Sequence, residues 1–251
     1  MIDLEQYLYD KLRPVFDSWE EDGIYAVSFF VYSNELFCFR GYSNVTHFAV
    51  SYNTERDCKG AARNSERRWN YAYWRKNEVP VFDSTEEIAA MDVLFDWYSQ
   101  TGITDIGSEE AGMDGPVGFS ELVEVLSRVA RRFQDEGYFN RKFGRPIPIL
   151  IHDLEYAACT WDATAYANPN EEAEDFLAGN WEEDRTETDP LGFGIPKKRI
   201  DAIMAAIEAD PELQKMKQQL ENTDGSNLDM ELFYRYDERL RMIISNTAQG
   251  S

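Results

Sequence analysis

The sequence predicts an α+β protein: an antiparallel sheet, arranged as a meander and packed with helices, followed by an all-helical C-terminal extension. Apolar residues recur at helical spacing in several segments, and short segments rich in Tyr, Val and Phe lie between them. After residue 196 only helical spacing is found. A hydrophobic content of 43% in 251 residues is sufficient for a buried core.

The N-terminal part of the chain supplies the first helix and the strands of the predicted sheet. Residues 3–19 place apolar side chains at helical spacing, with Pro14 as a break or kink. Residues 24–39 are rich in aromatic and β-branched residues around a polar turn, which predicts two antiparallel strands. Residues 45–52 predict a third strand, because large apolar residues alternate there with small or polar ones.

Two helices, a short strand and a further helix are predicted next. Residues 84–102 begin with a capping-box spacing and continue with apolar residues at helical intervals. The clearest helical stripe runs from residue 119 to 136, and Gly137 supplies its C-terminal stop. The apolar run at 147–151 predicts a buried strand, and residues 154–166 predict a helix.

Composition divides the chain into three parts. Residues 1–175 form the predicted α+β domain, residues 176–195 an acidic loop or linker, and residues 196–251 the helical extension. The linker is assigned because residues 171–189 contain nine acids and one base without sustained periodicity. In the extension, the Asp-Pro pair at 210–211 is typical of a helix start.

The net charge limits the kinds of partner that this protein can bind. Asp and Glu number 47 against 25 Lys and Arg, which gives a formal net charge of −22. Excess carboxylates repel phosphate groups and attract cationic molecules at long range. We therefore expect a basic protein as the partner, and we expect binding neither to nucleic acid nor to a membrane.

Location and cofactors follow from motifs that the sequence lacks. The first ten residues show neither the basic start nor the apolar run of a secretory signal, and every apolar stretch is too short to span a bilayer. We therefore expect a cytoplasmic protein. The three cysteines form no C-x-x-C pair, and no P-loop, dinucleotide-binding, H-E-x-x-H or nucleophile-elbow pattern occurs, so no cofactor is predicted.

The acidic segment is the first candidate site. Its carboxylates would form a docking surface for a basic protein, with two aromatic side chains as apolar anchors among the charges. The alternative is a solvated loop, because runs of like charge repel each other and extend. The predicted partner-binding residues are Glu171, Glu172, Glu174, Asp175, Phe176, Trp181, Glu182, Glu183 and Asp184.

A basic island is the second candidate site. Residues 56–76 contain seven Lys and Arg side chains interleaved with aromatic residues. In one interpretation, Arg67 and Arg68 bind a small anion or phosphate. In the other, which the net charge favours, the arginines pair with the protein's own acids while the aromatic rings enter the core.

His152, Asp153 and Glu155 form the third candidate site. They follow a predicted core strand, where loop side chains often line a cleft. Imidazole and carboxylate groups are ligands of Mg²⁺ or Mn²⁺, so a metal-dependent, hydrolase-like enzyme remains the alternative function. The structural interpretation is that Asp153 caps the next helix and His152 satisfies a local hydrogen bond. Without a recognised catalytic motif, a non-catalytic binding protein is the preferred prediction.

Several short motifs occur in an order that resembles a known family. They are Tyr25-Ala26-Val27, Asn53-Thr54-Glu55, Arg68-Trp69-Asn70-Tyr71-Ala72-Tyr73-Trp74, Asp135-Glu136-Gly137-Tyr138-Phe139, Ile149-Leu150-Ile151-His152-Asp153 and Asn168-Pro169. With these motifs, residues 1–175 resemble the bacterial family catalogued as domain of unknown function 4303. The resemblance implies a cytoplasmic protein without an assigned activity. By analogy with similar small acidic domains of bacterial toxin systems, it also implies an immunity-type inhibitor.

Overall fold

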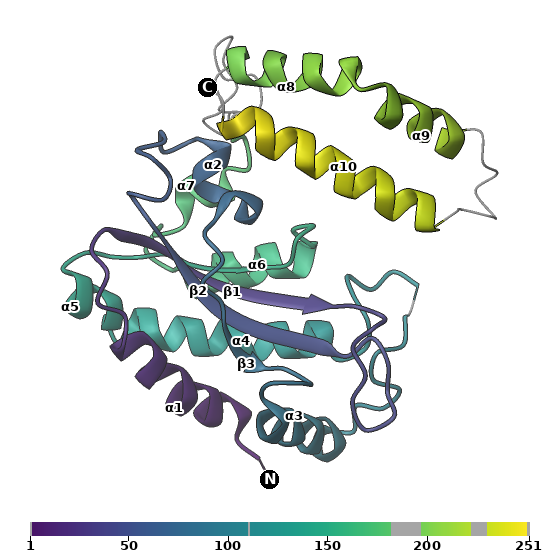
Figure 1. Ribbon diagram of the computed structural model, residues 1–251. Coiled ribbons are helices and arrows are strands. Elements are labelled where there is room, and N and C mark those ends of the chain that lie inside the picture. The colour runs from purple at the N-terminus through teal and green to yellow at the C-terminus, as the bar shows by residue number, and fades with distance from the viewer. Residues whose placement is uncertain (1, 110, 182–196, 222–229, 250–251) are drawn as a thin grey trace. The chain divides into compact units, whose positions relative to one another are not determined.

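The computed structural model describes residues 2–109, 111–181, 197–221 and 230–249 (Figure 1). The chain forms two compact units, residues 1–182 and residues 183–251. The first unit is α+β, as predicted, and contains a four-stranded sheet with helices packed on it. None of the helices in the described part of the chain combines the length and the apolar character that a membrane span requires.

The sheet has the strand order β3-β2-β1-β4. Its strands are β1 (Ile24–Ser33), β2 (Thr46–Thr54), β3 (Val79–Phe82) and β4 (Ile149–His152). The β1–β2 and β2–β3 pairs are antiparallel, but β4 lies parallel to β1. The sheet is therefore mixed, which corrects the prediction of an antiparallel meander. A parallel partner is possible because a long connection with several helices, rather than a hairpin, precedes β4.

One predicted strand is absent, and one strand was not predicted. Residues 24–39 contain β1 alone; the residues after it belong to the β1–β2 connection, in which Phe39 and Tyr42 form an isolated bridge. The strand that had not been predicted is β3, whose four residues include Pro80. Proline is tolerated there because β3 is an edge strand of the sheet.

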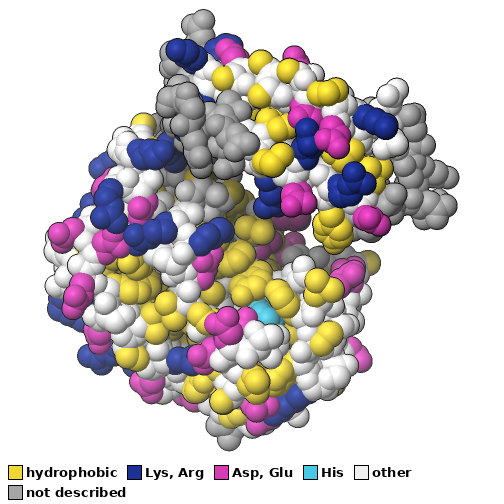
Figure 2. All heavy atoms as spheres, in the orientation of Figure 1, with side chains coloured by type: hydrophobic (Ala, Val, Ile, Leu, Met, Phe, Trp, Pro, Cys, Tyr) yellow, Lys and Arg dark blue, Asp and Glu magenta, His cyan; other side chains and the backbone are white. Residues whose placement is uncertain are grey.

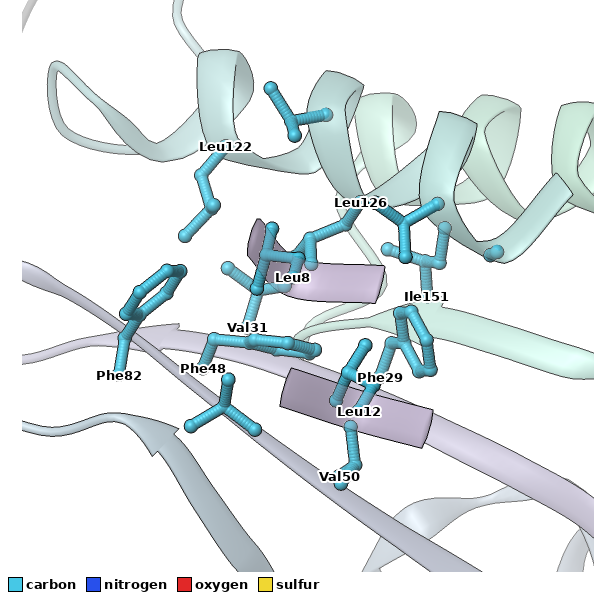
Figure 3. Packing of buried hydrophobic residues seen from close by; sticks show 14 of the residues in the cluster. Leu8, Leu12, Phe29, Val31, Phe48, Val50, Phe82, Leu122, Leu126 and Ile151 are labelled. Atoms are coloured by element: carbon cyan, nitrogen blue, oxygen red, sulfur yellow. The ribbon is translucent and has the colours of Figure 1, made fainter. Parts of the chain in front are cut away.

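The main core lies between one face of the sheet and three long helices. These are α1 (Leu4–Asp17), which continues through Pro14, α3 (Ile88–Thr101) and α4 (Phe119–Asp135). Their apolar stripes meet alternate residues of the strands, and Figure 3 shows several of these side chains interdigitating. The labelled residues in that view are Leu8, Leu12, Phe29, Val31, Phe48, Val50, Phe82, Leu122, Leu126 and Ile151.

A smaller aromatic cluster covers the opposite face of the sheet. It is built from α2 (Glu66–Trp69), the 3₁₀ turn Tyr71–Tyr73 and α7 (Glu174–Leu177), together with residues of β1 and β4. The short α5 (Tyr138–Phe143) follows α4, and α6 (Ala158–Ala167) packs against both α4 and β4.

The second unit is helical throughout its described residues. Its helices are α8 (Lys197–Ala209), α9 (Pro211–Glu221) and α10 (Met230–Gln249). Arg239 of α10 makes two hydrogen bonds of 2.9 Å to the Asp210 carboxylate in the α8–α9 turn. The buried side chains of Leu213 and Met216 lie in α9.

Side chains of α6 and of its C-cap residue form hydrogen bonds with backbone groups at the outer edge of β4. The Thr164 hydroxyl accepts a hydrogen bond from the Ile151 N–H and donates one to the Ile151 carbonyl, both at 2.8 Å. The Asn168 amide does the same for Ile149, at 3.0 Å and 2.8 Å. These bonds replace a neighbouring strand, so no backbone group of Ile149 or Ile151 is left open for another chain to pair with.

We expect Asn168→Ala to lower the free energy of unfolding by about 2 to 4 kcal/mol, because it leaves the buried N–H and C=O of Ile149 without partners. Urea denaturation measures the change. Asn170→Ala is the matched control, since within the described part of the chain that exposed side chain bonds Glu172 alone, and its effect should stay within about 0.5 kcal/mol. Equal effects of the two substitutions would contradict the proposed role of Asn168.

Candidate functional site

A cleft of about 590 Å³ lies at the carboxyl ends of the two parallel strands. Because β1 and β4 are parallel, the segments that follow Ser33 and His152 leave the sheet at the same edge, where sites commonly form in sheets of this kind. The α3–α4 connection supplies the third wall. Residues 32–35 and Asn44 line the first wall, and residues 153–155 line the second. The third wall consists of Glu109, residues 113–116 and Phe119.

The cleft combines carboxylates with exposed apolar side chains. Among the residues that the structure describes, five acids line it and no Lys or Arg does. Leu36, Met113 and Leu154 are 85%, 44% and 63% exposed, and each is the sequence neighbour of a lining carboxylate. Figure 2 shows apolar and acidic side chains side by side on the visible face of the first unit. The five acids are Glu35, Glu109, Asp114, Asp153 and Glu155.

Two of these carboxylates are fixed at the N-terminus of α6. Asp153 accepts a hydrogen bond of 2.9 Å from the Ala157 N–H, and Asp114 accepts one of 2.7 Å from the Cys159 N–H. The N-cap residue of α6 is Ala157, without a side-chain cap, so Asp153 bonds the residue before the first turn and is not itself the cap that the structural interpretation predicted. The positive end of the helix dipole compensates part of the repulsion between the two acids. Burial and the neighbouring Asp114 raise the pKa of Cys159 to about 12, so its thiol stays protonated.

A close backbone approach joins two of the connections that form the cleft. Gly107 has a φ of +82°, and a Cβ atom at this position would lie 1.9 Å from the Ser43 carbonyl oxygen. Only glycine allows the α3–α4 connection to lie this close to the β1–β2 connection. The Gly107 N–H also donates to the Val117 carbonyl at 2.9 Å, which closes the α3–α4 connection on itself.

Tyr156 directly follows residues 153–155, which line the cleft, but it is not itself a lining residue. Its φ of +56° is uncommon for a bulky residue. Its hydroxyl accepts a hydrogen bond of 2.9 Å from the Tyr71 N–H, and its ring packs beside His152 in the aromatic cluster. This conformation turns the ring inward while Leu154 and Glu155, just before it, stay exposed.

His152 belongs to the opposite face of the sheet and does not line the cleft. It is 1% exposed; its Nε2 lies 2.8 Å from the Ser28 hydroxyl and its Nδ1 lies 3.1 Å from the Asp153 carbonyl oxygen. A carbonyl can only accept, so we assign the proton to Nδ1, and Nε2 then accepts from Ser28. Burial lowers the pKa of His152 to about 4 by disfavouring the imidazolium, so the ring is neutral.

The structure thus brings Asp153 and Glu155 into the cleft without His152, which was predicted beside them. Because side chains alternate at the end of a strand, the imidazole faces the aromatic cluster while the next residues turn away. Among the residues that the structure describes, no group of three or more His, Cys, Asp or Glu side chains could hold a metal ion.

In the basic island, ion pairs join Arg56, Arg68, Arg75 and Lys76 to the protein's own acids. The Arg68 guanidinium makes two hydrogen bonds to the Glu55 carboxylate, at 2.8 Å and 2.5 Å, and lies 4.0 Å from the centre of the Tyr25 ring. Arg75 pairs in the same way with Glu21. An anion at Arg68 would have to displace Glu55. The geometry matches the interpretation that the net charge favoured; Arg67 lies half-buried in α2.

The acidic segment is tied to the aromatic cluster, which corrects one predicted anchor. Phe176 is 1% exposed and packs against Trp69 and Trp161, so it stabilises the fold and is not available to a partner. The half-buried Trp181 donates its indole N–H to the Phe176 carbonyl at 3.0 Å. The remaining predicted residues, Glu182, Glu183 and Asp184, lie outside the described residues.

The first acids of this segment face basic side chains across a small cavity of about 230 Å³. Arg63, Arg68 and Arg145 line one part of it. These acids are therefore opposed by positive charge from the same molecule, unlike those of the cleft. They are Glu171, Glu172, Glu174 and Asp175.

Sequence reasoning missed three acids of the cleft: Glu35, Glu109 and Asp114. The available signal was an exposed-loop pattern in which an acid neighbours a large apolar residue, as in Glu35-Leu36 and Met113-Asp114. The pattern alone could not show that these loops converge, because that depends on the parallel placement of β4.

Comparisons of the chain with protein-family models, curated proteins and solved structures found no match. The relationship to the family of domain of unknown function 4303 therefore stays a prediction.

We expect His152→Gln to change the pH dependence of stability. The pKa of His152 is about 4 when folded and near 6.5 when unfolded, so the unfolded chain binds the extra proton between these values. Wild-type stability should fall as the pH drops from 6.5 to 4, whereas this contribution is absent from the variant. The difference in free energy of unfolding between wild type and His152→Gln, measured by urea denaturation, should decrease by about 2 to 3 kcal/mol from pH 6.5 to pH 4. An advantage independent of pH would contradict a buried neutral imidazole.

We expect Gly107→Ala to destabilise the protein more than Gly112→Ala. Both glycines have positive φ, so either substitution costs about 1 kcal/mol of backbone strain. Only at Gly107 does the new methyl group meet backbone, since nothing lies within 4 Å at Gly112. Thermal unfolding should show an additional loss of about 2 kcal/mol for Gly107→Ala. Similar losses would mean that the two connections are not packed together in solution.

Proposed function

We propose that the protein is a non-catalytic acidic binding protein of the immunity-inhibitor type, which receives a basic segment of a partner protein in the cleft. The observation that carries the proposal is that the described lining of one cleft combines five carboxylates with exposed apolar neighbours and includes no Lys or Arg. Charge of one sign attracts and orients a partner, and desolvated apolar contacts at the centre of an interface supply binding energy.

The distribution of charge supports this location. Residues 1–181 contain 32 acids and 16 bases, whereas residues 197–221 and 230–249 together contain eight of each. The negative charge therefore belongs mainly to the unit that carries the cleft. A cationic protein would be attracted to that unit at long range, with a strong dependence on ionic strength.

Three acids of the cleft differ from the acids that pair with arginines. Glu21 and Glu55 are neutralised by arginines, and hydrogen bonds from Arg75 and Tyr52 lower the pKa of Glu21 to about 2. Glu35, Glu109 and Glu155 make no ion pair within the described part of the chain. Arg63, Arg68 and Arg145 line the cavity beside the acidic segment, whereas no cation is among the described residues that line the cleft, and this favours the cleft as the docking surface.

The metal-dependent hydrolase built on His152, Asp153 and Glu155 has no comparable support. Its imidazole is buried on the other face of the sheet and is already hydrogen-bonded to Ser28. Asp153 and Glu155 are better explained as part of the acidic cleft.

We expect the immobilised full chain to retain a basic protein from extracts of its native cells at low ionic strength and to release it at high ionic strength. Neutralising the cleft with Glu35→Gln, Glu109→Gln and Glu155→Gln should abolish this retention, because the attraction depends on these charges. Mass spectrometry of the eluates identifies the protein.

The matched control removes the same charge elsewhere, with Glu171→Gln, Glu174→Gln and Asp175→Asn, and should keep the partner. If the control variant loses the partner and the cleft variant keeps it, the docking surface lies on the acidic segment instead. Recovery of no basic partner by the wild-type chain would contradict the proposed function.

A further inference from the structure

The helices of the second unit lie in one layer. α8 and α9 follow one another along α10, and both pack against it (Figure 1). Among the side chains that the structure describes in this unit, only Leu213 and Met216 are buried. Domains are built from at least two packed layers, because one layer cannot cover the apolar stripes of its own helices. The second unit therefore has apolar surface that the layer itself leaves uncovered.

An apolar stripe runs along each of the two longer helices of this layer. On α10, Phe233, Leu240 and Ile244 are separated by seven and four residues, which places them on one side of the helix. On α8, Met204 and Ile207 are three residues apart and share a side in the same way. Met204, Phe233 and Ile244 are 49%, 41% and 40% exposed, and the other two are half-buried.

The two stripes open on the same side of the layer. α8 and α10 run in opposite directions (Figure 1). On each helix the half-buried residues mark the side that packs on the neighbour, and the exposed members of the stripe are displaced from that side in the same rotational sense. In an antiparallel pair of helices, such displacements bring both stripes to one face. The helical apolar face consists of Met204, Ile207, Phe233, Leu240 and Ile244.

We infer that the helical apolar face binds the same face of a second copy of the chain, so that the protein is a dimer joined through its second unit. A two-fold axis brings identical surfaces together. Two layers of antiparallel helices then form a four-helix bundle, in which amphipathic helices bury stripes of this kind. The inference goes beyond the proposed function, which concerns the cleft of the first unit.

Charge identifies a second copy as the occupant of this face. The described residues of the second unit contain eight acids and eight bases, whereas residues 1–181 contain 32 and 16. Two copies of the second unit therefore meet without net repulsion, which two copies of the first unit cannot do. Arg239 and Arg241 are also paired with acids of their own unit, Asp210 and Asp237. Such a surface offers no net charge to attract a strongly basic or acidic protein.

The layer is also large enough to hold a dimer together. α10 has 20 residues, and a helix of this length is about 30 Å long and about 10 Å wide. Two helical rods side by side therefore present about 600 Å² in projection, and the accessible surface of a corrugated face exceeds its projection. A specific interface of standard size buries about 800 Å² on each partner. The face of the second unit thus matches the area that a stable dimer needs.

Sedimentation equilibrium of the full chain over a range of concentrations tests the inference. We expect twice the chain mass of 29.1 kDa, with dissociation on dilution. Met204→Glu with Phe233→Glu should raise the Kd of the dimer at least about tenfold, because like charges then meet in the interface. Mixing this variant with Met204→Lys and Phe233→Lys on a second chain should restore association, because opposite charges then face each other.

Tyr234→Glu with Met242→Glu is the matched control. These side chains are 64% and 50% exposed and lie on other sides of α10, so the Kd should change by less than about threefold. A wild-type chain with the mass of one copy at every concentration would overturn the inference and leave the face to a different protein. A dimer weakened by the control but not by the Met204/Phe233 variant would overturn it as well. The wild-type measurement does not depend on the folding of any variant.

Discussion

The placement of β4 parallel to β1, with its outer edge satisfied by Thr164 and Asn168, is the constraint on which the cleft depends. Asn168 bonds the beginning of β4 and Thr164 its middle, so α6 runs back along the strand. The N-terminus of α6 therefore lies at the end of β4, beside the segment that leaves β1. Without these side-chain bonds the strand would present a row of buried, unpaired backbone groups, which is costly.

The fold uses its charged residues in two different ways. Around the aromatic cluster, arginines and acids neutralise one another, as Arg68 and Glu55 do over the ring of Tyr25. These pairs hold the α2 region onto the sheet, and hydrogen bonds from Arg68 lower the pKa of Glu55. In the cleft, by contrast, the described lining residues include acids but neither Lys nor Arg. The first arrangement stabilises the molecule, whereas the second leaves charge available to another molecule.

Sequence reasoning succeeded where the pattern is local and failed where it depends on the path of the chain. The stripe at 119–136 became α4 within one residue of its predicted end, because helical periodicity needs no distant partner. The direction of β4 cannot be read from its apolar residues, since parallel and antiparallel pairing bury them equally. Phe176 was misjudged for a related reason: its acidic neighbours indicated a surface loop, although the ring itself is buried beside Trp161.

The chemistry of the groups near the cleft favours recognition over catalysis. His152 is the nearest imidazole in sequence, but it is neutral, buried and hydrogen-bonded to Ser28, so it holds the sheet face together. The Cys159 thiol stays protonated beside Asp114 and is a poor nucleophile. What the cleft presents is carboxylates, two of them fixed on a helix terminus, next to exposed apolar side chains. Such a surface attracts a cation and buries the apolar groups beside it. These two processes are the physical basis of the proposed binding function.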